Sequence, residues 1–232
     1  MFALAMTEVA RQGVHLFQPG ILWSFPAFFH LVFCIVLIAC SWVGWSNSIQ
    51  NKRPLSDVFD WQFVDLLLDI VLVFVYFVIV YKVELSNDAQ VRSPIPSAAP
   101  EARGLLVVFC VYAVWDVVAD VFNSRMGRLS ACAVHISASL LCVLLSLGTY
   151  LFFNRTTREA SVVAVDAALV GLVFVFRALK PFERTVAELL RWDTKTIEEA
   201  GLRTTRPRDV LALASCGLVF LGGLGVAYVL ER

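Results

Sequence analysis

Five aspartates lie inside long apolar stretches of the chain, where an ionised side chain is unusual. They are Asp65, Asp69, Asp116, Asp120 and Asp166. If these stretches cross a bilayer, each carboxylate near the centre costs about 2.5–3.5 kcal/mol on insertion scales. Carboxylates at such depth bind cations, relay protons or pair with basic side chains. The chemistry to look for is therefore that of ions and protons.

The spacing of four of these aspartates places them in one layer. Asp65 and Asp69 are four residues apart near the start of one apolar stretch, and Asp116 and Asp120 are four apart near the end of the next. Residues i and i+4 share a helix face, and consecutive spans run in opposite directions, so both pairs fall in the same leaflet. His135 enters this leaflet near the start of the following stretch. We predict an ion-binding or proton-conducting site with these members: Asp65, Asp69, Asp116, Asp120 and His135.

Three further residues are secondary candidates. Tyr112 and Asn123 extend the face that carries Asp116 and Asp120, whereas Asp166 belongs to the opposite leaflet. An alternative stays open, in which the aspartates are ion-paired struts, because Lys and Arg flank the same leaflet and Arg pairs well with carboxylates. An intramembrane metal enzyme is a third alternative. The sequence contains no HExxH, GxSxG or phosphate-binding glycine loop, so we expect no enzyme and assign no catalytic residue, cofactor or metal.

Composition indicates the elements that must hold these residues. Of 232 residues, 59% are hydrophobic and 16% charged, with a mean hydropathy of +0.76; soluble domains have about 45–50% and about 25%. The chain is therefore expected to be an integral, multi-pass protein of a plasma or inner membrane, with the lipid bilayer as its first partner. Basic and acidic residues balance at 19 each, which gives no attraction to nucleic acid.

We predict an all-α membrane helix bundle forming one domain over residues 1–232. Six stretches have the roughly 20 apolar residues that a span needs: about 27–46, 61–81, 104–122, 129–153, 161–179 and 209–230. An amphipathic helix is expected at about 181–200, between the fifth and sixth spans, unless this segment merely lengthens them. Residues 1–18 are expected to form a short interfacial helix.

The distribution of Lys and Arg predicts the orientation. The first, third and fifth loops hold twelve of them and the other side holds seven, so the positive-inside rule places the fifth loop in the cytoplasm. We interpret Arg177, Lys180 and Arg184 as anchors to lipid headgroups. Tryptophans near the predicted interfaces fit an aromatic belt, although Trp115, beside Asp116, is also suited to line the polar site.

Two functions remain after this reasoning. The first is a channel or transporter for a small cation or a proton, built on the acidic site. The alternative is a non-catalytic membrane subunit or effector that acts through protein–protein contacts, using the fifth loop and the last span. That span contains four glycines, Gly217, Gly222, Gly223 and Gly225, which allow close helix packing. We therefore expect it to be buried, in the bundle or in a contact with a second copy or a partner membrane subunit.

Overall fold

The computed structural model describes residues 2–17, 24–49, 61–81, 97–123, 129–192, 197 and 202–232. This part of the chain is helical and contains no strand. Its elements, in chain order, are α1 (Phe2–Leu16), α2 (Phe25–Ile49), α3 (Trp61–Tyr81), α4 (Ala99–Asn123), α5 (Leu129–Phe153), α6 (Glu159–Leu179), the 3-10 turn η1 (Lys180–Phe182), α7 (Glu183–Leu189) and α9 (Pro207–Glu231).

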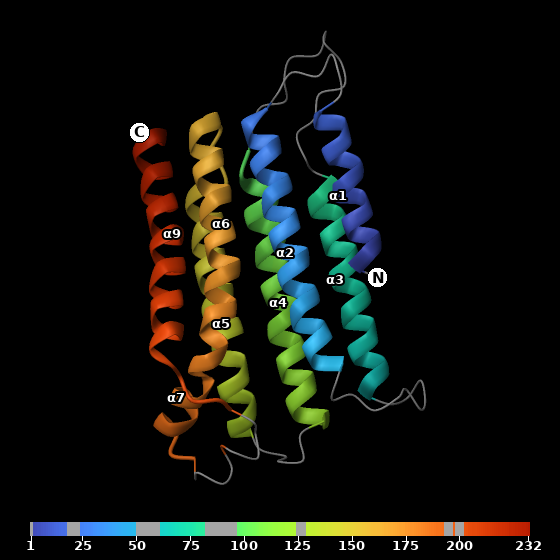
Figure 1. Ribbon diagram of the computed structural model, residues 1–232, viewed down its shortest axis with the longest axis vertical. Coiled ribbons are helices and arrows are strands. Elements are labelled where there is room, and N and C mark those ends of the chain that lie inside the picture. Colours follow the sequence, from blue (N-terminus) through green and yellow to red (C-terminus); the bar gives the residue numbers. More distant parts are fainter. Residues whose placement is uncertain are drawn as a thin grey trace.

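The long helices run side by side and alternate in direction (Figure 1). Helices α2, α4 and α6 end at the bottom of this view, where α3, α5 and α9 begin. We call this the lower end of the bundle. The alternation confirms that the C-terminal part of α2, the N-terminal part of α3 and the C-terminal part of α4 belong to one layer.

Four helical segments are long and apolar enough to cross a membrane, among the residues that the structure describes: Phe25–Ser46, Ala133–Phe153, Glu159–Leu189 and Pro207–Glu231. The chain is therefore an integral membrane protein. The second predicted span is a helix with a shorter apolar part, Leu66–Tyr81. The third lies within the longer helix α4, which includes Glu101, Arg103, Asp116 and Asp120. All six predicted segments are thus helical, and four of them lie in helices long and apolar enough to cross a membrane.

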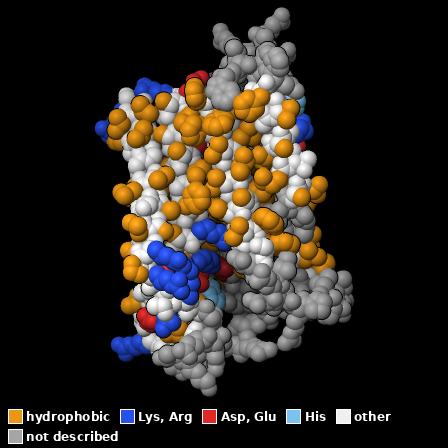
Figure 2. Space-filling model, viewed as in Figure 1, with side chains coloured by type: hydrophobic (Ala, Val, Ile, Leu, Met, Phe, Trp, Pro, Cys, Tyr) orange, Lys and Arg blue, Asp and Glu red, His pale blue; other side chains and the backbone are white. Residues whose placement is uncertain are grey.

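The outer surface of the bundle is apolar, as a membrane protein requires. Large hydrophobic side chains point outward along the helices, including Phe74 (67% exposed) and Phe152 (84% exposed). Figure 2 shows hydrophobic side chains over much of one face, with Lys and Arg in a cluster on its lower half and in smaller groups at the upper edge. The core between the helices is formed by buried aromatic and aliphatic residues such as Phe33, Leu37 and Phe109.

Helix α9 is not buried in the bundle, which excludes the first of the two alternatives for the last span and leaves a contact with a second copy or a partner subunit as a prediction. Among the described helices it packs chiefly on α6 (Figure 1), and only 11% of its apolar stretch is buried. A Cβ on Gly223 would lie 2.8 Å from the carbonyl oxygen of Ala164, so this glycine does mark a close helix contact. Gly217, Gly222 and Gly225 have nothing within 4 Å of such a Cβ. The glycines therefore do not act together at one interface within the chain.

The segment expected to form one amphipathic helix at 181–200 is interrupted at residues 190–192. Helix α6 continues through η1 into α7, which ends at Leu189. Arg191 then adopts φ 57°, and the N–H of Trp192 donates to the carbonyl of Ala187. This is the left-handed ending that stops many helices, and here it occurs without a glycine. The alternative, in which the segment lengthens the fifth span, holds for residues 180–189; residues 193–196 and 198–200 are outside the described part.

The N-terminal helix also differs from its prediction. Instead of lying across the end of the bundle, α1 runs along α2 and α3 over the upper half (Figure 1). Its buried residues are Ala5, Val9, Gln12 and Leu16, whose spacing of four, three and four places them on one helix face. Helix α1 therefore packs on the bundle through one largely apolar stripe.

Candidate functional site

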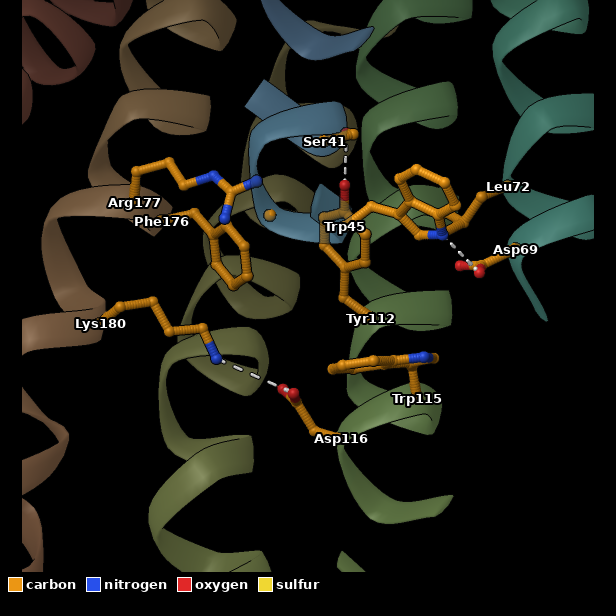
Figure 3. A pocket seen from close by; sticks show the side chains of 11 residues that line it. Ser41, Trp45, Asp69, Leu72, Tyr112, Trp115, Asp116, Phe176, Arg177 and Lys180 are labelled. Atoms are coloured by element: carbon orange, nitrogen blue, oxygen red, sulfur yellow. Dashed lines mark hydrogen bonds and ion pairs between the residues drawn. The ribbon is translucent and has the colours of Figure 1, made fainter. Parts of the chain in front are cut away.

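A cavity of about 140 Å³ lies between the helices toward the lower end. Figure 3 shows its charged and aromatic side chains. Helices α2, α3, α4 and α6 and the turn η1 all contribute. The lining residues are Ser41, Gly44, Trp45, Asp69, Leu72, Tyr112, Trp115, Asp116, Phe176, Arg177 and Lys180. The cavity thus contains two acidic and two basic side chains among aromatic walls.

Asp116 is the more strongly connected of the two acids. It is 6% exposed and accepts a hydrogen bond from the hydroxyl of Ser139 on α5. The Nζ of Lys180 lies 3.8 Å from its Oδ1, and the same ammonium group lies 3.0 Å from a carboxylate oxygen of Glu183. One cation is therefore shared between two carboxylates.

Asp69 faces the cavity from α3. The indole N–H of Trp45 donates to its Oδ2 at 2.8 Å, and the residue is 8% exposed. Asp69 and Trp45 come from neighbouring helices, so this hydrogen bond fixes the carboxylate relative to α2.

Arg177 projects from α6 into the same cavity, opposite Asp69 (Figure 3). Its guanidinium donates to the backbone carbonyl of Cys40 and lies 5.8 Å from the ring centre of Phe176. A Cβ on Gly44 would collide with the guanidinium. The absence of a side chain at position 44 is what lets the arginine reach α2.

Three hydroxyl groups continue from the cavity into the core. The hydroxyl of Tyr112 is hydrogen-bonded to that of Ser41 and lies 3.1 Å from that of Tyr76. The side chain of Tyr76 is fully buried. The Ser41 hydroxyl also donates to the backbone carbonyl of Leu37. Hydroxyl groups both donate and accept, so this chain can pass a proton from the cavity toward the middle of the bundle once the Ser41 hydroxyl turns toward Tyr112.

A second buried polar group lies nearer the upper end. His30 on α2 and Glu101 on α4 are each 1% exposed, and the Nδ1 of the histidine contacts Oε1 of the glutamate. The Nε2 of His30 lies 3.0 Å from the backbone carbonyl of Ile79. A carbonyl can only accept, so Nε2 carries a hydrogen. The contact between Nδ1 and the carboxylate then requires one more proton, which the two residues share.

The structure brings part of the predicted site together. Asp69, Asp116 and the secondary candidate Tyr112 line the cavity. His135 does not line the cavity, but it interacts electrostatically with Glu183 at the start of α7. Asp166 is fully buried in the other half of α6, eleven residues or ~16 Å before Arg177. The side chains of Asp65, Asp120 and Asn123 lie outside the described part.

Several residues of this arrangement were not predicted. Arg177 and Lys180 were interpreted as headgroup anchors, yet both line the cavity. Trp45 and Trp115 were assigned to an aromatic belt and line it as well. For Trp115 the adjacent aspartate was the available signal. The predicted span began at residue 104, which placed Glu101 in a loop. Nothing in the sequence therefore indicated that Glu101 pairs with His30.

Comparison of the chain with protein families, curated proteins and solved structures gives no match.

Proposed function

We propose that this integral membrane protein relays protons across the bilayer. The observation that supports the proposal is the hydroxyl chain of Ser41, Tyr112 and Tyr76, which leads from the charged cavity into the core. It points along the bundle toward the buried pair of His30 and Glu101. Groups that can hold a proton thus occur at both ends of a line of hydroxyls.

The charge balance of the cavity favours protons over other cations. Arg177 and Lys180 stand beside Asp69 and Asp116, so a metal cation would meet as much repulsion as attraction. Among the described side chains, no group of three His, Cys, Asp or Glu residues could hold a metal ion. Proton transfer needs only titratable groups and hydroxyls within hydrogen-bonding reach, and those are present.

Apolar side chains surround the space between the cavity and the pair of His30 and Glu101. From His30 to Ser41 is eleven residues of α2, or ~16 Å along the axis. Leu37, Leu105 and Phe109 are buried in the core of this region. Hydrophobic constrictions block conduction until water enters. Proton transfer through this region therefore depends on water that enters it transiently.

We also propose that α3 and α4 complete six membrane spans. Both run the length of the bundle beside the four qualifying helices (Figure 1). The charged residues of α4 are Glu101 and Arg103 at its upper end, Asp116 at the cavity, and Asp120 one turn further on. With six spans, the excess of Lys and Arg in the odd loops orients the lower end toward the cytoplasm.

Proton flux into liposomes tests the proposed function. The purified protein is reconstituted with a pH-sensitive dye inside, and a potassium gradient with valinomycin sets the potential. We expect acidification above that of empty liposomes and a loss of at least tenfold in Tyr112→Phe, because phenylalanine interrupts the hydroxyl chain. Tyr150→Phe is the matched control, since Tyr150 packs against the core outside the chain. Flux equal to empty liposomes, or equal flux in both variants, would reject the proton relay.

A non-catalytic membrane subunit is the second candidate. Asp116 has Lys180 and Ser139 as partners, as expected of a structural strut, and α9 leaves most of its apolar surface exposed. This function predicts no flux, together with a stable complex that is lost when residues on the outer face of α9, such as Leu218 (73% exposed), are changed to charged ones. Cross-linking in native membranes would detect that complex.

A further inference from the structure

The cavity at the lower end has two walls of opposite charge. Arg177 and Lys180 extend from α6 and η1, whereas Asp69 and Asp116 extend from α3 and α4 (Figure 3). Arg177 and Asp69 lie on opposite sides of the space. A solute that carries both charges would meet a partner of opposite sign at each end.

Arg177 is the residue of the cavity wall with the most hydrogen-bond donors left for a ligand. A guanidinium has five N–H donors in a planar fork that matches a carboxylate. Among the described residues it contacts the carbonyl and the side chain of Cys40 and the ring of Phe176. Among the described side chains no carboxylate lies within ion-pair distance of it. In a membrane segment such a cation is costly, and a bound carboxylate would compensate it.

Aromatic side chains form the remaining walls. Trp45, Tyr112, Trp115 and Phe176 line the space together with Leu72. Faces of aromatic rings attract cations, and cages of such rings bind methylated ammonium groups. A volume of about 140 Å³ admits a solute of a few carbon atoms. The walls therefore favour a small molecule with an apolar, positively charged end near Asp69 and a carboxylate at Arg177.

We propose that the cavity binds a small zwitterion that carries a carboxylate and a methylated ammonium group. Simple cations are disfavoured by Arg177 and Lys180, and simple anions by Asp69 and Asp116. The inference rests on the proposed function in one respect, that the cavity is the lower end of the proton relay. A bound zwitterion would contact the hydroxyl of Tyr112 and so couple its own movement to that of the proton.

Calorimetric titration of the detergent-purified full chain tests this with three probes of nearly equal shape. Glycine betaine carries both charges, 3,3-dimethylbutanoate replaces its nitrogen with carbon, and choline replaces its carboxylate with a hydroxymethyl group. We expect saturable binding of glycine betaine at least tenfold tighter than that of either single-charge probe. Equal binding of the three, tighter binding of choline or of 3,3-dimethylbutanoate, or no binding of glycine betaine would overturn the proposal.

Two variants locate the site. Arg177→Gln should weaken glycine betaine binding at least tenfold, whereas Arg184→Gln should not change it, because Arg184 lies on α7 and pairs with Glu188. Unchanged affinity in Arg177→Gln would refute the assigned wall. If Arg177→Gln fails to fold, the comparison of the three probes in the wild-type protein still tests the proposal. Glycine betaine binding without proton flux rejects the relay alone, and flux without binding rejects the zwitterion site alone.

Discussion

Replacing Lys180 should destabilise the protein more than replacing its partner Asp116. Asp116→Asn leaves Lys180 with Glu183 at 3.0 Å and leaves Ser139 an oxygen to donate to. Since the lysine side chain is also 34% exposed, we expect a cost of only about 1 kcal/mol, below the 3–5 kcal/mol typical of breaking a fully buried pair. Lys180→Met instead leaves two largely buried carboxylates without their shared cation, and should cost about 3 kcal/mol.

Thermal unfolding in detergent, followed by tryptophan fluorescence, measures the difference. At roughly 2–4 °C per kcal/mol for a chain of this size, Asp116→Asn should lower Tm by about 3 °C and Lys180→Met by about 9 °C. The double variant should cost about 1 kcal/mol less than the sum of the two, because only one carboxylate then lacks the cation. Arg184→Met, which breaks the more exposed pair with Glu188, is the control and should stay within about 2 °C. A loss in Lys180→Met no larger than in Asp116→Asn would refute the idea of one cation shared by two acids.

Three other predictions follow from the same structure. Gly223→Leu should lower Tm and reduce folded yield because its side chain would enter the contact with α6, while Gly222→Leu should be tolerated; equal effects would contradict the packing of α9. Glu101→Gln should change stability by less than about 1 kcal/mol, since its amide can donate to the histidine in place of the shared proton, whereas Glu101→Ala should cost about 2–4 kcal/mol; a costly Gln variant would exclude the shared proton. A cysteine at Arg191 should be protected from an impermeant thiol reagent in intact cells and one at Arg155 should be labelled, and the reverse pattern would invert the proposed orientation.

The helices and the shared layer of Asp69 and Asp116 could be predicted from the sequence. The length of the apolar stretches predicts which segments are membrane-spanning helices. The alternation of their direction places the start of α3 and the end of α4 at the same end of the bundle. Both inferences depend on local composition and connectivity alone. They therefore hold without knowledge of how the helices pack against each other.

The start of α4 could not be predicted in this way. Its first residues follow a proline-rich segment that suggests an extended spacer, yet the helix begins at Ala99 with Pro100 in its first turn. Proline is well tolerated there because the first N–H groups of a helix have no partner within it. Counting apolar residues starts the helix at 104 and so assigns Glu101 to a loop. The buried pair with His30 was missed for this reason.

The position of Arg177 shows which information only the packed structure holds. A basic residue near the end of a span normally reaches toward lipid headgroups, and nothing in the sequence around Arg177 suggests otherwise. The deciding residue is Gly44, 133 positions earlier, which leaves room for the guanidinium beside the Cys40 carbonyl. Gly44→Ala should therefore displace the guanidinium and weaken glycine betaine binding without removing any charge. If the affinity falls while proton flux is unchanged, binding depends on where the guanidinium lies and not on its charge alone.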